Sequence, residues 1–302
     1  MRFCTFKDIE DYVLKQGICK KVVLMNAHDS HSLPAVADAK RKGVITAALI
    51  GNGERIAEML KGLGEPVADY EIIHNTDDAE CARQAIAMVK EGRADYPMKG
   101  LMQTADFMRA ILDKENGLLP PGNLLSQATI VEHPADHKMF LVTDCAINIA
   151  PDYDQKVKIV ENAVSLAHKL GYEKPKVAAV SALEIPNPKI PSTMDARALQ
   201  EANEQGQITG CIIGGPLALD NAVSAEAARH KGVRGPVAGD ADILLMPDLA
   251  AGNIFTKSLT FYANMTSAGT LLGTSTPVIA ASRTDTPQNK YYAILIALLH
   301  SL

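Results

Sequence analysis

Lys21-Val-Val-Leu-Met25 and Thr46-Ala-Ala-Leu-Ile50 are two short, continuously apolar runs, and a helix-length segment at 32–42 separates them. Continuous apolar runs of this length are typical of strands that are buried on both faces of a sheet. A strand, a helix and a second strand in this order predict a unit in which the two strands run parallel.

The same alternation continues through most of the chain. Further predicted strands are Phe140-Leu-Val-Thr143, Val177-Ala-Ala-Val-Ser181, Cys211-Ile-Ile213, Ile243-Leu-Leu-Met246 and Val278-Ile-Ala-Ala281. Further predicted helices lie at 53–63, 77–91, 153–170, 194–205, 220–231 and 288–300. This order predicts an α/β protein with a mostly parallel sheet or sheets.

Length and composition limit the class of protein. The chain has 302 residues, which suggests about two domains. The turn-rich segment 113–123 contains two Gly and two Pro, and predicts a hinge between them. Lys and Arg number 30 against 35 Asp and Glu, for a net charge of −5, and aromatic residues make up only 5%. This balance argues against nucleic acid as a partner.

The sequence also predicts a cytoplasmic protein with no membrane partner. Its first residues lack the apolar core of a signal peptide. No apolar run approaches the roughly 20 residues needed to span a membrane. The five cysteines are scattered and form no C-x-x-C motif, which argues against a disulfide framework and a zinc knuckle.

Cofactor motifs are weak or missing. Gly51-Asn-Gly53 is similar to the start of a dinucleotide fingerprint, but Ile56 replaces the third glycine, so a tight turn is favoured. No P-loop motif is present. His133 and His137 are four residues apart, but Pro134 lies between them, and surface histidines are favoured over a metal site. We therefore predict no metal and no bound cofactor.

Ser282-Arg283 is the most suggestive pair at a strand end, where ligands bind in open parallel sheets. Thr286 can cap the next helix, with Pro287 at its first position. The free N–H groups of a helix start and a planar guanidinium are both suited to binding phosphate. The alternative is that Arg283 only pairs with Asp285.

Other polar side chains follow strands or begin helices. Lys99, Arg109 and Lys257 are three cations in such positions, although each alone could belong to a solvated face. Cys145 could be a nucleophile, but with no histidine near it in sequence a buried structural cysteine is favoured.

Seven collinear stretches resemble the phosphate acetyl/butyryltransferase family, and its butyryl branch in particular. They are Met98-Lys-Gly-Leu-Met-Gln-Thr-Ala-Asp-Phe-Met-Arg-Ala-Ile-Leu112, Thr143-Asp-Cys-Ala-Ile-Asn148, Asn187-Pro-Lys-Ile-Pro-Ser-Thr-Met-Asp-Ala196, Gly215-Pro-Leu-Ala-Leu-Asp-Asn-Ala222, Gly239-Asp-Ala-Asp-Ile-Leu-Leu-Met-Pro-Asp248, Ala251-Gly-Asn-Ile254 and Ser282-Arg283. Together they extend over nearly the whole chain, which makes the resemblance more specific than any one motif.

The resemblance implies a two-domain α/β/α architecture like that of isocitrate and isopropylmalate dehydrogenases, with the active site in the cleft between domains. It also implies that the last residues return to the first domain. We therefore expect one domain of residues 1–127 plus 279–302 and a second of residues 128–278. Family members commonly form homo-oligomers.

The implied reaction is the reversible conversion of an acyl-CoA and inorganic phosphate to an acyl phosphate and CoA, by direct attack in a ternary complex. By resemblance, Ser282 and Arg283 stabilise the intermediate or leaving group, and Arg109 binds phosphate or CoA. Expected substrate-binding positions, from these stretches and the strand ends, are Lys99, Thr104, Arg109, Cys145, Asn148, Gly215, Asn253 and Lys257.

One departure from the family pattern leaves the base open. Acetyl-type members place a catalytic carboxylate about two helical turns after the Ser-Arg pair, where this chain has Asn289. Either Asp285 takes that role or no carboxylate base is used. Butyryl-CoA is the expected acyl donor, and acetyl-CoA is the alternative. A dehydrogenase or a non-catalytic acyl-CoA-binding protein on the same fold is a more remote alternative.

Overall fold

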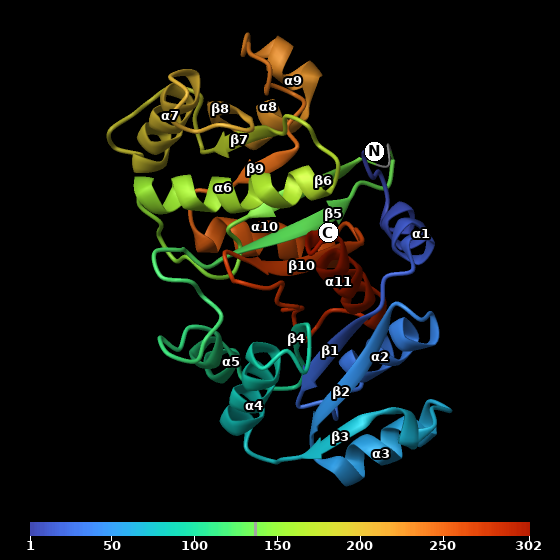
Figure 1. The fold of residues 1–302 in the computed structure, drawn as a ribbon. Helices are drawn as coiled ribbons and strands as arrows, with labels where there is room; N and C mark the ends of the chain where they lie inside the picture. The colour runs from blue at the N-terminus through green and yellow to red at the C-terminus, as the bar shows by residue number, and fades with distance from the viewer. Residues whose placement is uncertain (136–137) are drawn as a thin grey trace. The chain divides into compact units, whose positions relative to one another are not determined.

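The computed structural model describes residues 1–135 and 138–302, which form two compact units (Figure 1). We call residues 6–123 and 268–302 the terminal unit, because they include the C-terminus and most of the N-terminal half. Residues 1–5 and 124–267 form the central unit. The terminal unit contains a four-stranded sheet and the central unit contributes five strands to a second sheet, in agreement with the predicted α/β class.

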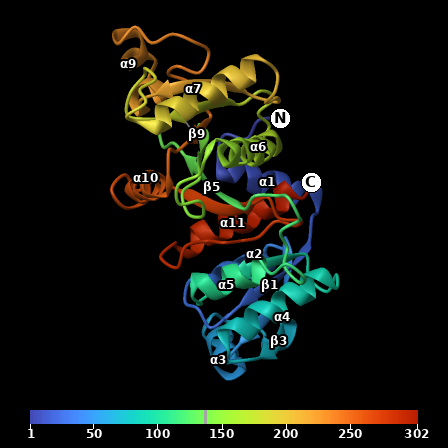
Figure 2. The same cartoon turned by 90° about the vertical axis from the view of Figure 1, so that its left-hand side faces the viewer.

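The terminal unit has a four-stranded sheet in the order β3-β2-β1-β4, with every pair parallel. Its strands are β1 (Lys20–Met25), β2 (Ile45–Gly51), β3 (Glu71–His74) and β4 (Tyr96–Lys99). Its helices are α1 (Phe6–Gln16), α2 (Ser32–Arg41), α3 (Gly53–Gly62), α4 (Asp78–Lys90), α5 (Thr104–Ile111) and α11 (Pro287–His300), with a 3₁₀ turn at Val67–Asp69. Helices α4 and α5 pack against each other and lie together in the side view (Figure 2).

Helix α11 returns the end of the chain to this unit. Ten of its 14 residues are buried, and it packs against α1 and α2. The rings of Phe6 and Tyr292 stack with their centroids 4.5 Å apart. This burial of apolar area holds the C-terminal helix in place and thereby fixes the segment that precedes it.

The central unit contributes five strands in the order β5-β6-β9-β7-β8, of which only β5 and β6 pair antiparallel. The strands are β5 (Ser126–Glu132), β6 (Met139–Thr143), β7 (Lys176–Val180), β8 (Ile212–Leu217) and β9 (Ile243–Leu245). The helices are α6 (Tyr153–Lys169), α7 (Pro191–Glu204), α8 (Leu219–Val223), α9 (Ala225–His230) and α10 (Leu249–Phe261). Strand β10 (Ser267–Leu272) begins where the two units meet in sequence.

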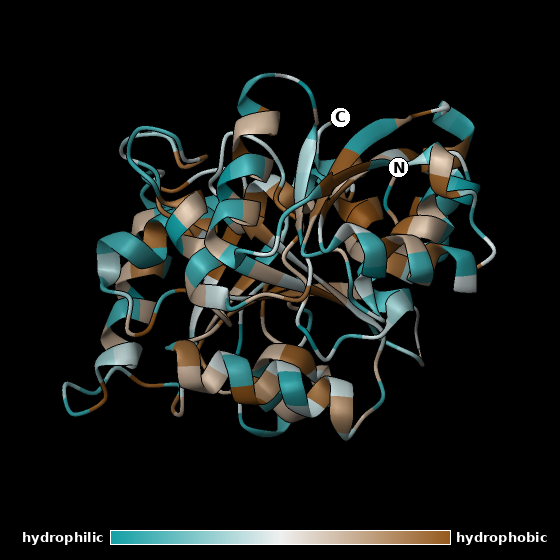
Figure 3. Cartoon of the chain, turned by 90° about the horizontal axis from the view of Figure 1, so that it is seen from below, coloured by the Kyte–Doolittle hydropathy of each residue, from teal (hydrophilic) through white to brown (hydrophobic). Residues whose placement is uncertain are grey.

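Hydropathy follows this layering. Strands are largely hydrophobic, and the helices carry alternating hydrophobic and hydrophilic bands (Figure 3). The buried strand faces and helix stripes form the core of each unit. Within the described residues, no helix is both long and apolar enough to cross a membrane.

The unit boundaries differ from those expected at 127/128 and 278/279. Met1–Thr5 belongs to the central unit, where Phe3 N–H donates to the Leu170 carbonyl (3.1 Å). The central unit already begins at Leu124, whose carbonyl accepts from Asn162 on α6 (3.0 Å). The segment 268–278 belongs instead to the terminal unit, since Thr276 Oγ1 donates to the Asp95 carbonyl (3.0 Å).

Three predicted elements also need correction. The single helix expected at 220–231 is two helices, because Ser224 ends α8 and caps α9, accepting from Ala227 N–H (3.2 Å). The strand expected at 278–281 forms only isolated bridges, at Val278 and Ile279. The strand expected at 211–213 continues to Leu217.

Candidate active site

The terminal unit brings Lys99 and the Ser282-Arg283 pair to the same edge of its sheet. Lys99 ends β4, and Met98 forms a parallel bridge with Ile279. Lys99 N–H donates to the Ile279 carbonyl, and Ile279 N–H donates to the Pro97 carbonyl, both at 2.9 Å. Ser282 follows three residues later, so residues nearly 200 positions apart in sequence lie at one strand end.

The turn that contains Ser282 and Arg283 is tightly hydrogen-bonded. Ser282 N–H donates to the Asp285 carboxylate (2.7 Å), and Ser282 Oγ lies 3.1 Å from Thr284 Oγ1. Thr286 caps α11 by accepting from Asn289 N–H (3.1 Å), with Pro287 in the first turn, which confirms the predicted helix start. The Asp285 carboxylate is thus occupied in shaping the turn.

Arg283 has an exposed side chain with no ion pair among the residues that the structure describes. Pairing of Arg283 with Asp285, the alternative from sequence, is therefore wrong. An exposed guanidinium on a fixed turn is available for an anionic ligand.

Two buried lysines complete a cationic cluster with Arg283. Lys290, on α11, is 1% exposed, and its ammonium donates to the Ser282 carbonyl at 2.9 Å. Lys99 is 5% exposed, and no hydrogen-bond or ion-pair partner for its ammonium occurs in the described chain. Burial, reinforced by the charges of Arg283 and Lys290, lowers the pKa of Lys99 to about 8.

Asp29 is the carboxylate that faces this cluster. It follows β1, is 7% exposed, and its charge acts on both Lys99 and Lys290 by opposing their pKa shifts. Its oxygens accept from the backbone N–H groups of His31 and Ser32, each at 3.1 Å, and from the Ser32 hydroxyl. With these partners Asp29 is held firmly and leaves the cluster with a net positive charge.

Helix α5 presents the remaining expected residues of the terminal unit. Thr104 is the first residue of the helix and is exposed. Arg109, one helical turn beyond Asp106, is also exposed and donates to the Asp106 carboxylate at 2.6 Å. This ion pair lies at the surface, where such a pair contributes little to stability.

In the central unit, Cys145, Asn148 and Asn253 gather around one loop. The Asp144 carboxylate accepts from the N–H groups of Ala146 (2.8 Å) and Ile147 (3.0 Å) and from Asn148 Nδ2 (2.6 Å). Asn253 Nδ2, on α10, donates to the Cys145 carbonyl (3.2 Å). Burial raises the pKa of Asp144 in spite of these hydrogen bonds.

Cys145 is a buried thiol. It is 2% exposed, and its Sγ donates to Gln127 Oε1 (2.6 Å) and lies 3.3 Å from Thr129 Oγ1. Burial raises the pKa of this thiol to about 12. A neutral, enclosed thiol is a poor nucleophile, which agrees with the structural cysteine favoured from the sequence.

Comparison with known proteins identifies the family. The family model described as Phosphate acetyl/butaryl transferase matches residues 73–298. A phosphate butyryltransferase of Clostridium acetobutylicum is 43% identical over 286 residues, which cover 95% of each protein. A phosphate acetyltransferase of Thermotoga maritima is 40% identical over 284 residues, covering 94% of this chain and 96% of the relative. This chain belongs to the phosphate acetyl/butyryltransferase family.

A solved structure gives the same result for the fold. The branched-chain phosphotransacylase from Enterococcus faecalis is 34% identical to this acyltransferase, and the match covers 93% of this chain and 98% of that one with a TM-score of 0.82. The family, the acyltransferase class and the α/β fold expected from the sequence are thus confirmed.

The structure of the acyltransferase corrects the placement of Gly215. The residue lies inside β8, and its N–H donates to Gln200 Oε1 at 3.0 Å. A Cβ at this position would lie 2.8 Å from the Cβ of Ala179, so close packing between β7 and β8 requires glycine here. Lys257 lies on α10, with its Nζ 5.8 Å from the Phe261 ring centroid.

Asp29 and Lys290 are the site residues that sequence reasoning missed. Asp29 stood at a predicted strand end, which was a usable signal. Lys290 is the one charged residue between Pro287 and Leu299, a run that is otherwise nearly apolar. Such a lone lysine in a buried helix is rare unless a partner is present.

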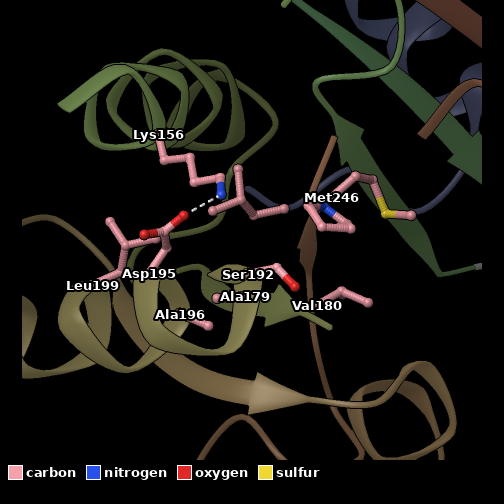
Figure 4. A pocket seen from close by; sticks show the side chains of 10 residues that line it. Lys156, Ala179, Val180, Ser192, Asp195, Ala196, Leu199 and Met246 are labelled. Atoms are coloured by element: carbon pink, nitrogen blue, oxygen red, sulfur yellow. Dashed lines mark hydrogen bonds and ion pairs between the residues drawn. The ribbon is translucent and has the colours of Figure 1, made fainter. Parts of the chain in front are cut away.

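A separate, small pocket lies in the central unit, at the carboxyl ends of β7 and β9 (Figure 4). Its polar wall is the ion pair of Lys156 and Asp195 (2.6 Å), and Ser192 Oγ beside it lies 2.7 Å from Ser181 Oγ. The other lining residues are apolar. None of the expected site residues lines this pocket.

The described residues contain no group of three or more His, Cys, Asp or Glu that could hold a metal ion. Of the histidine pair weighed in the sequence, His137 lies outside the described residues, and His133 lies beyond β5.

Proposed function

We propose that this acyltransferase converts a short-chain acyl-CoA and inorganic phosphate reversibly to an acyl phosphate and CoA, with butyryl-CoA as the preferred donor. The supporting observation is the cluster of Lys99, Arg283 and Lys290, in which the largely buried Lys99 has no hydrogen-bond or ion-pair partner for its ammonium in the described chain. An uncompensated buried charge is costly, and a bound dianion would relieve that cost. Phosphate is the dianion of this reaction.

In the proposed mechanism phosphate attacks the thioester carbon directly. The cluster holds the phosphate desolvated and aims one oxygen at the carbonyl carbon. Ser282 Oγ and the Arg283 guanidinium stabilise the charge that develops on the carbonyl oxygen and the leaving group. The raised pKa of the Cys145 thiol supports a ternary complex over an acyl-cysteine intermediate.

We further propose that the remaining expected positions, Thr104, Arg109, Asn148, Asn253 and Lys257, bind the CoA portion or phosphate. Arg109 and Lys257 would supply cations for the CoA phosphates, and the others hydrogen bonds. No metal or resident cofactor is needed in this scheme, because the thioester is already an activated acyl donor.

The proposal includes a homo-oligomer in the cytoplasm. All five cysteines are free, which suits a reducing compartment. Ile254 and Phe261 on α10, and Tyr262 after it, are large apolar residues that are 59% to 90% exposed, which suits contact with a second copy. Sedimentation of the purified protein measures the oligomeric state.

Thiol release from butyryl-CoA and acetyl-CoA, in phosphate and in phosphate-free buffer, tests the proposed function. We expect phosphate-dependent release that is faster with butyryl-CoA, and faster release with acetyl-CoA would make the enzyme an acetyltransferase. Arg283→Ala should lower kcat/KM for phosphate roughly 10–100-fold, since a charge-assisted hydrogen bond contributes about 1.5–3 kcal/mol. Arg55→Ala, at an exposed arginine of α3, is the matched control. No phosphate-dependent release from either thioester would reject the proposal.

A further inference from the structure

The leaving group of this reaction needs a proton donor, and the two carboxylates beside the Ser-Arg turn already accept hydrogen bonds from the chain. Asn289 occupies the position of the expected carboxylate, and an amide does not ionise. The Asp285 carboxylate accepts the Ser282 N–H, and the Asp29 carboxylate accepts three hydrogen bonds from His31 and Ser32. Without a proton donor, the CoA sulfur would leave as a thiolate anion.

Lys99 has the position and the surroundings of a proton carrier. It ends β4 beside the Ser282-Arg283 turn, and the residue is only 5% exposed, with no hydrogen-bond or ion-pair partner for its ammonium within the described residues. Three charged groups face it: Arg283 from the turn, Lys290 from α11, and Asp29 from the loop after β1. Burial and, to a smaller extent, the two cations favour its neutral amine, while Asp29 favours its ammonium.

We propose that Lys99 is the general acid and base of the acyl transfer. Its ammonium gives a proton to the CoA sulfur as the C–S bond breaks and the new C–O bond to phosphate is complete. Its neutral amine then takes the proton of the newly formed acyl hydrogenphosphate. This inference rests on the proposed function, because it assigns a role within that reaction.

The relay balances without any other reactant. Hydrogenphosphate and the thioester enter, and the acyl phosphate dianion and CoA thiol leave, so one proton passes from phosphate oxygen to sulfur. The attacking oxygen and the sulfur are bonded to the same tetrahedral carbon in the intermediate. A side chain that contacts the bound phosphate can therefore reach the sulfur with a small rotation.

The surroundings of Lys99 match the chemistry that the relay requires. A thiol has a pKa near 8.5, and an acid–base catalyst works best with a pKa close to that of its partner and to the working pH. Burial and the neighbouring cations lower the pKa of Lys99 to about 8, within that range. Lys290 differs from Lys99 in having a partner, because its ammonium donates to the Ser282 carbonyl at 2.9 Å.

Lys99→Arg keeps the positive charge but removes the ability to transfer a proton, because a guanidinium stays protonated at every useful pH. We expect KM for phosphate to stay within about threefold and kcat to fall on the order of 100-fold in both directions, the usual size of an acid–base contribution. The limb of the pH–rate profile near pH 8 should vanish. Lys114→Arg, at an exposed lysine of the same unit, is the control.

Lys99→Ala gives an independent test if arginine disturbs the packing. Ethylamine added to this variant should raise kcat at least tenfold. With a series of amines that differ in pKa, the restored rate should vary with the pKa of the amine. Lys99→Arg with wild-type kcat and pH profile, or Lys99→Ala without rescue by amines, would overturn the assignment. Absence of phosphate-dependent turnover in the wild-type enzyme would instead reject the proposed function itself.

Discussion

Glu10→Gln should lower the free energy of unfolding of the terminal unit by about 2 kcal/mol at neutral pH. The Glu10 carboxylate on α1 accepts from Lys7 Nζ (2.9 Å), Lys42 Nζ (2.7 Å) and the Tyr291 hydroxyl (2.7 Å). Tyr291 is 1% exposed on α11, so this carboxylate ties the C-terminal helix to α1 and to the end of α2. The same helix carries the Ser282-Arg283 turn at its start.

The magnitude follows from the pKa of Glu10. Burial alone raises this pKa, but the hydrogen bonds from Lys42, Lys7 and Tyr291 outweigh it and lower the pKa from 4.5 to about 2. A shift of this size sets an upper limit of about 3 kcal/mol. Lys7 is 65% exposed, and its ion pair contributes little in water, which reduces the expected loss to about 2 kcal/mol.

The sign of the pH dependence is fixed by the direction of the shift. A carboxylate with a lowered folded-state pKa stabilises the protein fully above pH 4.5, and this contribution disappears as pH falls through about 2. The difference in the free energy of unfolding between wild type and Glu10→Gln, measured by urea unfolding, should be less than half as large at pH 3 as at pH 7.

The control for this measurement is Glu58→Gln, at an exposed carboxylate of the same unit, which should change stability little at any pH. Because the chain has two units, unfolding is followed by a probe confined to the terminal unit, such as exchange of its backbone amides. If Glu10→Gln lowers the free energy of unfolding equally at pH 7 and pH 3, the ionic explanation is refuted and only a packing effect remains.

Two further predictions concern the loop around Asp144. Cys145→Ala should keep kcat within about threefold, and ping-pong kinetics of the wild-type enzyme would contradict the absence of an acyl-cysteine intermediate. In the native protein the exposed Cys4 and Cys19 should react with a thiol reagent far faster than Cys145, because burial raises the pKa of the Cys145 thiol to about 12. Gly252→Ala should destabilise the central unit by more than about 2 kcal/mol in thermal unfolding, because the added Cβ would lie 2.4 Å from the Asp144 carbonyl oxygen. The control is Gly62→Ala in α3, where an added Cβ has no atom within 4 Å, so this variant should have unchanged or increased stability.

The sequence predicted the elements that have a clear apolar pattern and missed those without one. Continuous runs such as 21–25 and 46–50 became central strands of the terminal sheet. Strand β3, Glu71–His74, is only half-buried at the sheet edge, so its sequence shows no apolar run. Helix α10 mixes apolar and polar residues along its length and buries only Gly252, and therefore shows no amphipathic period.

The candidate site was predictable only in part, for a topological reason. Ser282, Arg283 and the Thr286 cap are adjacent in sequence, and local chemistry identifies them. Lys99, Asp29 and Lys290 join them through the bridge of Met98 to Ile279 and the packing of α11 on α2. Such contacts between distant segments depend on tertiary structure, and periodicity and spacing give no access to them.

The charge distribution explains why a mildly acidic chain can serve an anionic substrate. The net charge is −5, but many surface lysines are paired, as in Lys21 with Glu71 (2.6 Å). At the Ser-Arg turn the pairing is left incomplete, since Asp29 faces two buried lysines and Arg283 is exposed. Folding must overcome the repulsion and desolvation of these cations, which α11 achieves by burying ten residues. The stability of the apolar helix thus maintains an excess of positive charge, which in the proposed mechanism binds a phosphate dianion and adapts Lys99 to proton transfer.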